Sequence, residues 1–299
     1  MRVFVTGASG FIGSAVVPEL IDAGHKVLGL ARSDASADAL AAAGAEVQRG
    51  ALGDLDSLRA GAAASDGVIH LAYIHDFSQY EAAARADLRA IETLGAALEG
   101  TDRPLVITGG TLGLTSGSGR TATEQDAPDP NAPFSHRSAN AVVALSFAER
   151  GVRSSVVRLS PTVHGEGDHG FVPALIGIAR DKGVSGYIAD GSSRWPAVHR
   201  LDAARLFRLS LEKAPAGSVL HGVDDEGVPT RDIAELIGRH LGVPAVSVSP
   251  ADAAGHFGWL GGALGADVPT SSALTRELLD WHPTQPGLIA DLEAGHYFR

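Results

Sequence analysis

Three glycines near the N-terminus have the spacing of a phosphate-binding turn. The segment VTGASGFIG places Gly7, Gly10 and Gly13 between an apolar run and an amphipathic one. In such a turn the first glycine permits a tight bend, the second lets the backbone approach a pyrophosphate, and the third allows close packing of helix on strand. The N–H groups that begin the helix then face the phosphates. We therefore predict a dinucleotide-binding site that also includes Ser9, Phe11 and Ile12.

The residues after the second apolar run indicate which dinucleotide binds. NAD-selective proteins usually carry an acidic residue there, which bonds the ribose 2′-hydroxyl, whereas an arginine accommodates the 2′-phosphate of NADP. The segment GLARSD places Arg32 and Ser33 at this point, with Asp34 beside them. We expect NADP(H) to be preferred and NAD(H) to be possible. The alternative interpretation is that Arg32 is a solvated surface residue.

The elements that position these residues alternate between strands and helices. Near-continuous runs of β-branched residues and leucine are typical of parallel strands that are buried on both faces. Amphipathic segments lie between the runs, and several end on glycine, as helices do. This alternation predicts an α/β fold with a Rossmann-type, doubly wound parallel sheet. The predicted strands span residues 2–6, 26–31, 45–49, 67–72, 104–108 and 153–159.

The regular alternation stops near residue 160. We expect the rest to be too irregular for a second sheet domain and to form a small, mostly helical lobe over the carboxyl ends of the strands. Helices are predicted near 172–182 and over 198–213, 228–242 and 270–283, with one strand over 218–223. The predicted division is a dinucleotide-binding domain over 1–165, to which 198–223 returns, and a substrate-binding lobe over 166–197 and 224–299.

The composition argues against several kinds of protein. A formal net charge of −11 is unfavourable for a broad nucleic-acid or anionic-membrane surface. The chain has no cysteine, which excludes disulfides and thiolate chemistry. His164, Asp168 and His169 match no metal-ligand spacing, so no metal site is predicted. Because the N-terminus lacks a signal-peptide layout and no run of about 18 apolar residues occurs, we expect a cytoplasmic protein whose partner is a small-molecule substrate.

Several segments, in this order along the chain, resemble the short-chain dehydrogenase/reductase superfamily in its extended, epimerase/dehydratase-like branch. They are TGASGFIG, GDLDSL (53–58), VIHLA (68–72), LVITGGT (105–111) and VVRLSPTVHG (156–165), and the resemblance covers essentially the whole chain. It implies that Asp54 and Leu55 bracket the adenine, although Asp54 is also suited to cap a helix. The other residues that it implies beside the cofactor are Leu71, Ala72, Tyr73, Thr108, Pro161 and Val163.

The sequence departs from this superfamily at the catalytic residues. In the superfamily a Tyr-x-x-x-Lys pair passes a proton to or from the substrate oxygen while hydride moves. The usual proton relay is therefore not expected here, because no tyrosine of this chain has a lysine four residues later. The four tyrosines are Tyr73, Tyr80, Tyr187 and Tyr297.

Other residues near these positions have suitable chemistry. The tyrosine position falls on Phe134, Ser135 or His136, and the serine position falls near Gly110, between Thr108 and Thr111. We predict that Thr111 holds a carbonyl oxygen and that His136 donates a proton, because an unperturbed histidine has a pKa of about 6.5. Arg137 can polarise an oxyanion or bind an acidic substrate. The alternative is that His136 and Arg137 are solvated residues in the first turn of a helix.

Three further residues are candidates for contact with the substrate. His75 follows the fourth strand, His164 follows the sixth strand near the expected nicotinamide, and Trp195 precedes a helix that would face the cleft. A structural role is the alternative for each of them. His70 lies within a predicted strand, and we expect a hydrogen-bonded core histidine there.

These observations favour an NADPH-dependent oxidoreductase that reduces a small carbonyl compound by hydride transfer without the usual tyrosine and lysine. A non-catalytic sensor or regulatory protein that binds NADP(H) is the main alternative. A sugar-nucleotide epimerase or dehydratase is less favoured, because its first step oxidises a hydroxyl and needs a strong base. The resemblance also implies a homodimer, formed through the helices before and after the fifth strand.

Overall fold

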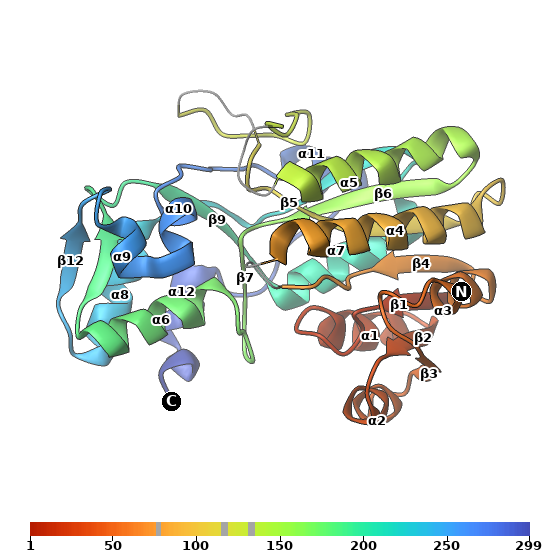
Figure 1. Cartoon of the computed structure of the whole chain (residues 1–299), viewed down its shortest axis with the longest axis horizontal. Coiled ribbons are helices and arrows are strands. Elements are labelled where there is room, and N and C mark those ends of the chain that lie inside the picture. The colour runs from red at the N-terminus through yellow and green to blue at the C-terminus, as the bar shows by residue number, and fades with distance from the viewer. Residues whose placement is uncertain (76–78, 115–118, 131–134) are drawn as a thin grey trace.

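Seven parallel strands form the central sheet of the protein (Figure 1). The computed structural model describes residues 1–75, 79–114, 119–130 and 135–299. The strand order is β10-β6-β5-β4-β1-β2-β3, and every neighbouring pair is parallel. This is the order of a doubly wound Rossmann sheet, extended by β10 beside β6. The strands are β1 (Arg2–Thr6), β2 (Lys26–Ala31), β3 (Glu46–Arg49), β4 (Gly67–His70), β5 (Pro104–Gly110), β6 (Arg153–Leu159) and β10 (Ser218–Gly222).

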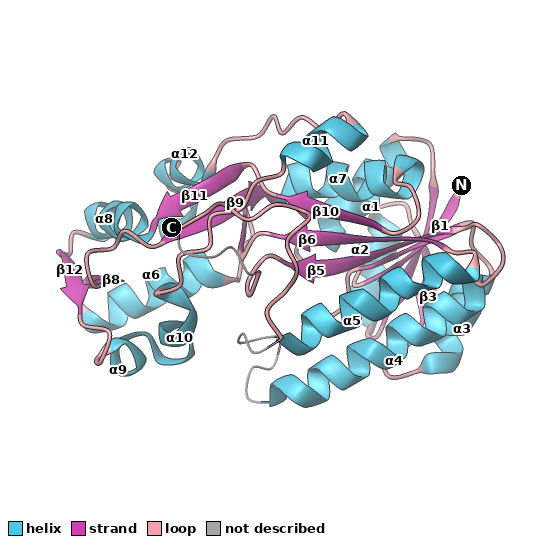
Figure 2. Cartoon of the chain, turned by 90° about the horizontal axis from the view of Figure 1, so that it is seen from above, coloured by secondary structure: helices cyan, strands magenta, loops and turns pink. Residues whose placement is uncertain are grey.

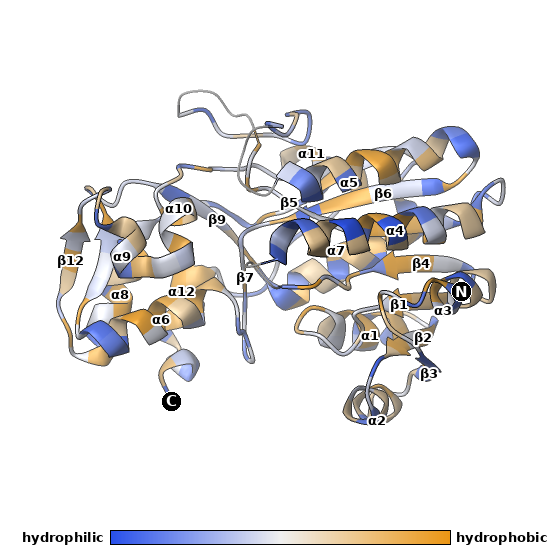
Figure 3. Cartoon of the chain, viewed as in Figure 1, coloured by the Kyte–Doolittle hydropathy of each residue, from blue (hydrophilic) through white to orange (hydrophobic). Residues whose placement is uncertain are grey.

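Helices cover both faces of the sheet (Figure 2). Because successive side chains of a strand point to opposite faces, Val3 and Val5 pack with α1 (Gly13–Asp22), α2 (Asp34–Ala42) and α7 (Arg200–Lys213), whereas Phe4 packs on the other side. That side is covered by α3 (Leu55–Ala63), α4 (Tyr80–Leu98), α5 (Ser135–Ser146) and the 3-10 helix η2 (Phe147–Arg150). Figure 3 shows β4 as mostly apolar, in keeping with its complete burial.

The apolar runs in the first half of the sequence are confirmed as strands. The fourth run ends earlier than expected, at His70, and the fifth extends to Gly110. The predicted strand over 218–223 is β10, which joins the main sheet beside β6. Within the described ranges, no helix combines the length and the apolar character needed to cross a membrane.

The lobe contains two small sheets as well as helices. The sheets have the strand orders β11-β9-β7 and β12-β8. Their strands, which the sequence did not predict, are β7 (Thr162–His164), β8 (Ser185–Ile188), β9 (Arg194–His199), β11 (Asp225–Pro229) and β12 (Ala245–Val248). The lobe helices are α6 (Phe171–Lys182), α8 (Thr230–Leu241), α9 (Ala253–Phe257), η3 (Gly258–Leu260), α10 (Gly261–Leu264), α12 (Leu288–Glu293) and η4 (His296–Phe298).

Short connections join the lobe to the carboxyl ends of the main sheet. Residues 160–161 separate β6 from β7, and residues 223–224 separate β10 from β11. The helix predicted over 198–213 begins instead at Arg200, because β9 continues to His199 and α7 follows at once. The remaining helix, α11 (Ala273–Leu279), packs on β10 and α7. The lobe therefore lies beside the glycine turn, which also leaves the carboxyl end of a strand.

Candidate functional site

The glycine turn is packed so tightly that two of its glycines admit no side chain. Gly7 has a φ of 67°, and a Cβ on it would lie 2.7 Å from the backbone nitrogen of Ala72. A Cβ on Gly13 would lie 2.1 Å from the carbonyl oxygen of Gly7. A Cβ on Gly10 would meet only that same oxygen, at 3.2 Å. The first and third glycines therefore hold the turn against its neighbours, and the second leaves one side open to a ligand.

The helix that follows the turn is electrostatically suited to phosphate. No side chain caps the N-terminus of α1, and its first turn carries no acidic residue. The positive end of the helix dipole is therefore not neutralised by the protein itself. Ser9 and Gly10 are exposed, and Phe11 and Ile12 are half-buried. The open side of the turn and this uncapped helix fit the diphosphate of a dinucleotide.

The end of β2 presents a free arginine. Arg32 is exposed and makes no hydrogen bond or ion pair within the described part of the chain. Ser33 caps α2 by accepting a hydrogen bond from the backbone of Ser36 at 3.2 Å. Asp34 is paired with Arg49 on β3. The carboxylate nearest to Arg32 in the sequence is thus engaged elsewhere.

Asp54 caps α3, as its sequence allowed. It accepts a hydrogen bond from the backbone of Ser57 at 3.2 Å, and it is exposed. The neighbouring residues that were predicted to line the cofactor each keep part of their surface accessible. These half-buried residues are Leu55, Leu71, Ala72, Tyr73, Thr108, Pro161 and Val163.

A buried carboxylate connects four elements around the site. His70 Nε2 lies 3.2 Å from Asp87 Oδ1. His70 Nδ1 lies 2.7 Å from the hydroxyl oxygen of Thr6. Asn140 donates a hydrogen bond to Asp87 Oδ2 at 2.7 Å. Burial raises the pKa of Asp87, but the hydrogen bonds from His70 and Asn140 outweigh it and hold that pKa below its usual range. Asp87 is therefore an anion, so His70 Nε2 donates to it and Nδ1 accepts from Thr6.

This network fixes the residues on either side of the cofactor. Thr6 precedes the glycine turn and also accepts a hydrogen bond from the backbone of Ala72 at 3.2 Å. Asp87 belongs to α4 and Asn140 to α5. The prediction of a hydrogen-bonded core histidine at His70 is confirmed. Asp87 was not predicted from the sequence, although a carboxylate among the buried alanines and leucines of one helix face was a usable signal.

Arg137 lies over Tyr73 at the start of α5. Its guanidinium carbon is 4.3 Å from the centre of the Tyr73 ring, and its backbone N–H donates to the hydroxyl of Tyr80 at 3.4 Å. Arg137 Nε is buried and has no hydrogen-bond partner among the described residues. Burial, reinforced by Tyr80, raises the pKa of Tyr73, which keeps that phenol protonated. A cation and a neutral phenol thus share one side of the site.

Two histidines, His75 and His136, lie near Arg137 and Tyr73. The ring of His75 stands edge-on to Tyr73 at 5.3 Å between ring centres. Burial, Arg137 and His169 lower the pKa of His75, which favours its neutral form. His136 is exposed, with its ring centre 6.1 Å from that of Tyr80. Ser135 and His136 begin α5, whereas Phe134 lies outside the described residues.

Thr111 has a buried hydroxyl that finds no partner among the residues that the structure describes. The residue follows β5, is 1% exposed, and donates its backbone N–H to Leu159 at 3.0 Å. Its Oγ1 has no hydrogen-bond partner among the described residues. The nearby Thr108 is different, because its hydroxyl donates to the carbonyl oxygen of His70 at 3.0 Å. Only one of these two hydroxyls is therefore free for a ligand.

Two of the predicted substrate residues lie away from this cluster. Val163 packs towards the core on the α1 and α7 side. Because successive side chains of a strand point to opposite faces, His164 points the other way from β7. His164 is completely buried and donates from Nδ1 to Asp291 on α12 at 2.8 Å. Trp195 is buried in the lobe, with its ring centre 5.3 Å from that of Phe171.

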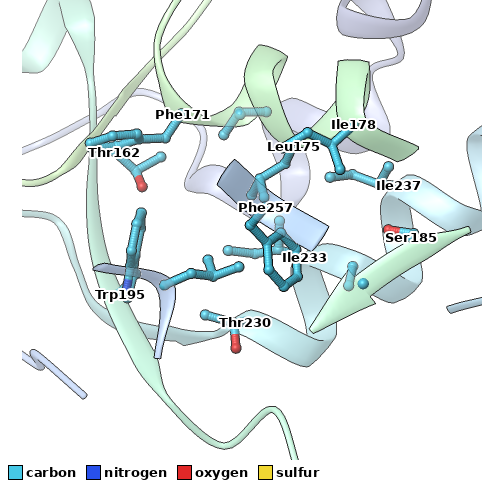
Figure 4. A pocket seen from close by; sticks show the side chains of 14 residues that line it. Thr162, Phe171, Leu175, Ile178, Ser185, Trp195, Thr230, Ile233, Ile237 and Phe257 are labelled. Carbon is cyan, nitrogen blue, oxygen red and sulfur yellow. The ribbon is translucent and has the colours of Figure 1, made fainter. Parts of the chain in front are cut away.

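The cavity beside Trp195 belongs to the lobe core. It is lined mainly by apolar side chains, among them Phe171, Trp195, Ile233 and Phe257 (Figure 4). Its free volume is about 10 Å³, which is the room that about one water molecule needs. A carbonyl substrate would not fit in it. The residues that can meet a ligand are instead those around the glycine turn, Tyr73 and Arg137.

A comparison with protein families shows which family the chain belongs to. The model of the NAD dependent epimerase/dehydratase family matches residues 3–221, which run from β1 to the end of β10 and include the glycine turn. The chain belongs to the NAD dependent epimerase/dehydratase family. This family member is thus an NAD(P)-binding Rossmann protein, as the resemblance implied.

Relatives of this epimerase/dehydratase family member cover most or all of its length. An uncharacterised protein of Schizosaccharomyces pombe is 52% identical over 299 residues, which is 100% of both chains. An uncharacterised protein of Saccharomyces cerevisiae is 46% identical over 298 residues, or 99% of each chain. The 4-hydroxy-2-methyl-3-oxo-4-farnesyl-3,4-dihydroquinoline-1-oxide ketoreductase of Stigmatella aurantiaca is 28% identical over 86% of this chain and 80% of its own.

A solved structure supports the fold. The dTDP-glucose 4,6-dehydratase DesIV of Streptomyces venezuelae, crystallised with NAD, superposes with a TM-score of 0.80. The superposition covers 99% of this chain and 96% of that one, at 19% sequence identity. At this identity the likeness concerns the fold alone.

Proposed function

We propose that the protein is an NADPH-dependent reductase of a small carbonyl compound. The observation that carries this proposal is the buried hydroxyl of Thr111, which has no partner among the described residues. A buried polar group without a partner costs about 1–3 kcal/mol, so a ligand atom that completes its hydrogen bond is favoured. A carbonyl oxygen is such an acceptor, and Thr111 lies at the carboxyl edge of the sheet, where ligands of doubly wound folds bind.

The residues of this chain would then act on the substrate as follows. The nicotinamide, when bound, supplies the hydride. Thr111 donates a hydrogen bond to the carbonyl oxygen, and the guanidinium of Arg137 stabilises the negative charge that develops there. His136 is exposed at the start of α5 and donates the proton. Tyr73, whose raised pKa keeps it protonated, is a second candidate for this donor.

Two observations support NADPH as the reductant and a ketone as the substrate. Arg32 has no protein partner within the described ranges, and Asp34 is held by Arg49, so a 2′-phosphate would meet a free cation. NAD(H) remains a possible cofactor. The relative from Stigmatella aurantiaca is named as a ketoreductase. Arg137 also suits a carbonyl substrate that carries a carboxylate, because a guanidinium binds carboxylate through paired hydrogen bonds.

A second candidate is a non-catalytic NADP(H) sensor. The glycine turn together with the lack of a Tyr-x-x-x-Lys pair favours it, because such a chain can bind the dinucleotide without the usual proton relay. Sugar-nucleotide epimerisation or dehydration fits less well, since a chain without a Tyr-x-x-x-Lys pair lacks the base that the first oxidation needs.

The test begins with protein stripped of nucleotide and titrated with NADPH and NADH. A screen of aldehydes, ketones and oxo acids then follows the oxidation of the bound cofactor. We expect tighter NADPH binding, and turnover that falls in Thr111→Val and His136→Ala. Tight binding without turnover on any carbonyl compound would favour the sensor. Full turnover in both variants would refute the roles given to Thr111 and His136.

A further inference from the structure

Arg200 reaches from the junction with the lobe to the glycine turn. It is the first residue of α7, directly after β9. Its guanidinium carbon lies 5.3 Å from the centre of the Phe11 ring. Its stem packs against the loop after β7, where a Cβ on Gly165 would lie 3.2 Å from Arg200 Cγ. The side chain is therefore held by packing, with its charged end beside the turn.

Apart from its contact with the Phe11 ring, the guanidinium of Arg200 has no partner among the residues that the structure describes. It makes no hydrogen bond or ion pair with any residue in the described ranges. Glu166, which follows Gly165 in the sequence, forms no ion pair with Arg200 in the part of the chain that is described. Asp168 is engaged elsewhere, because it accepts from the backbone of Gly170 at 2.7 Å and from Tyr297 at 3.0 Å. Within the described ranges, the N–H donors of the half-buried Arg200 are thus free for a ligand.

The packing of two helices brings Arg200 to the same end of the site as the phosphate-binding helix. α1 and α7 lie side by side on one face of the sheet. They are linked by an ion pair between Glu19 and Arg208 at 2.7 Å. Each helix leads into a strand of the same parallel sheet, α1 into β2 and α7 into β10, so the two helices run in the same direction. Their C-terminal ends meet through His25 and Glu212 at 2.9 Å, so both N-termini lie at the other end. Arg200 was not among the predicted site residues, although the helix expected over 198–213 was predicted to face the cleft.

We propose that Arg200 binds the diphosphate of the bound dinucleotide. Phe11 belongs to the turn and precedes α1, so a cation above its ring lies beside the diphosphate position. The N-terminus of α1 faces the diphosphate from one side, and Arg200 faces it from the lobe side. A planar guanidinium binds two phosphate oxygens at once, and stacking on an aromatic ring orients it for this. The proposal rests on NAD(P) binding and does not depend on carbonyl reduction.

An anionic group of the substrate is the competing ligand. The position of Arg200 argues for the cofactor, because its contacts are with the glycine turn and the loop after β7. The cation that lies against Tyr73 is Arg137, at the start of α5. Arg200 would thus bind the diphosphate of the cofactor, and Arg137 would bind the substrate.

The experiment compares Arg200→Gln with wild type and with Arg205→Gln in the full-length protein. Arg205 is on the same helix and makes no ion pair or ring contact within the described ranges, so it is a matched control. Calorimetric titrations would use NADPH, NADH and ADP, which carry a diphosphate, and adenosine 2′-monophosphate, which does not. Thermal unfolding without ligand checks that each variant folds, and Arg200→Lys retains the charge without the planar group.

We expect Arg200→Gln to bind the three diphosphates about tenfold more weakly, since a hydrogen bond to a charged group is worth at least that factor. Binding of adenosine 2′-monophosphate should stay within about twofold, as should all binding by Arg205→Gln. The diphosphate affinity of Arg200→Lys should lie between those of wild type and Arg200→Gln. At high salt the difference in affinity between wild type and Arg200→Gln should become smaller.

Three results would overturn the proposal. They are unchanged diphosphate binding in Arg200→Gln, an equal loss for adenosine 2′-monophosphate, and a wild type that binds no diphosphate. Unchanged binding together with a loss of carbonyl turnover would assign Arg200 to the substrate instead. Because the readout is binding, a protein that reduces no carbonyl compound would refute the proposed function and leave the role of Arg200 intact.

Discussion

Replacing Thr111 by valine should separate a ligand-binding hydroxyl from a structural one. Valine has the shape of threonine but carries a methyl group in place of the hydroxyl. In the folded protein the Oγ1 atom of Thr111 is buried and has no partner among the described residues. Its desolvation therefore destabilises the free protein, and its removal should have the opposite sign to most buried substitutions.

The size of the effect follows from two terms. Relieving an unpaired buried hydroxyl is worth about 1–3 kcal/mol, and burying a methyl group in its place adds up to about 0.8 kcal/mol. Allowing for imperfect packing, we expect the free energy of unfolding to rise by about 1–2 kcal/mol. For a chain of this size each kcal/mol raises Tm by about 2 °C.

Thr108→Val is the matched control, three residues earlier on β5. Its hydroxyl donates to the carbonyl oxygen of His70 at 3.0 Å, so its loss should lower the free energy of unfolding by about 1 kcal/mol. Urea denaturation followed by tryptophan fluorescence can measure both variants, because Trp195 and Trp281 are buried. On a carbonyl substrate, Thr111→Val should also reduce kcat/KM by about 100-fold, as loss of one oxyanion donor does.

The reasoning would be refuted if Thr111→Val were destabilised as much as Thr108→Val. That result would mean that the Thr111 hydroxyl has a partner in the free protein. A stabilised Thr111→Val with unchanged turnover would keep the packing argument and remove Thr111 from the reaction.

Other predictions concern the cofactor and the buried charges. Arg32→Ala should weaken NADPH binding by about tenfold and leave NADH binding unchanged, and an unchanged ratio of the two dissociation constants would exclude Arg32 from cofactor choice. Asp87→Asn should lower the free energy of unfolding by about 2–3 kcal/mol at neutral pH, because it weakens hydrogen bonds to a buried charge. The folded-state pKa of Asp87 is lowered, so the stability that its charge contributes is present above the unfolded-state pKa of about 3.9 and is lost below it. As the pH falls below about 3.9, the free energy of unfolding of wild type should therefore drop more than that of Asp87→Asn. Burial lowers the pKa of His221, so the unfolded state takes up a proton first and stability should fall as the pH drops below about 6.5. His221→Asn can keep the hydrogen bond to the Ser271 carbonyl and should flatten that slope in denaturation curves measured at several pH values.

The main sheet was predictable because its strands carry their own signal. A strand such as β1 is buried on both faces, so it must be apolar at consecutive positions, and the turn that follows it needs glycine for steric reasons. The lobe strands carry no such signal. β7 is three residues long, and β11 reads DEGVP, so their pairing depends on the lobe around them. β9 runs into α7 without a turn, which is why its end was assigned to a helix.

The candidate site was predictable only where one segment supplies it. The glycine turn and the cap at Asp54 are local, and both were found. The link from His70 to Asp87 and Asn140 joins residues from three separate elements, so it depends on how those elements pack. Arg200 likewise acquires its position only because α7 lies beside α1.

The absence of any spacer between β9 and α7 has a mechanical consequence. β9 is the middle strand of the lobe sheet β11-β9-β7, and α7 lies on the main sheet, so one unbroken stretch of regular structure crosses from one body to the other. Hinge motions need a few residues whose backbone torsion angles can change, and none stand between His199 and Arg200. The lobe therefore cannot rotate at this junction unless β9 or α7 bends.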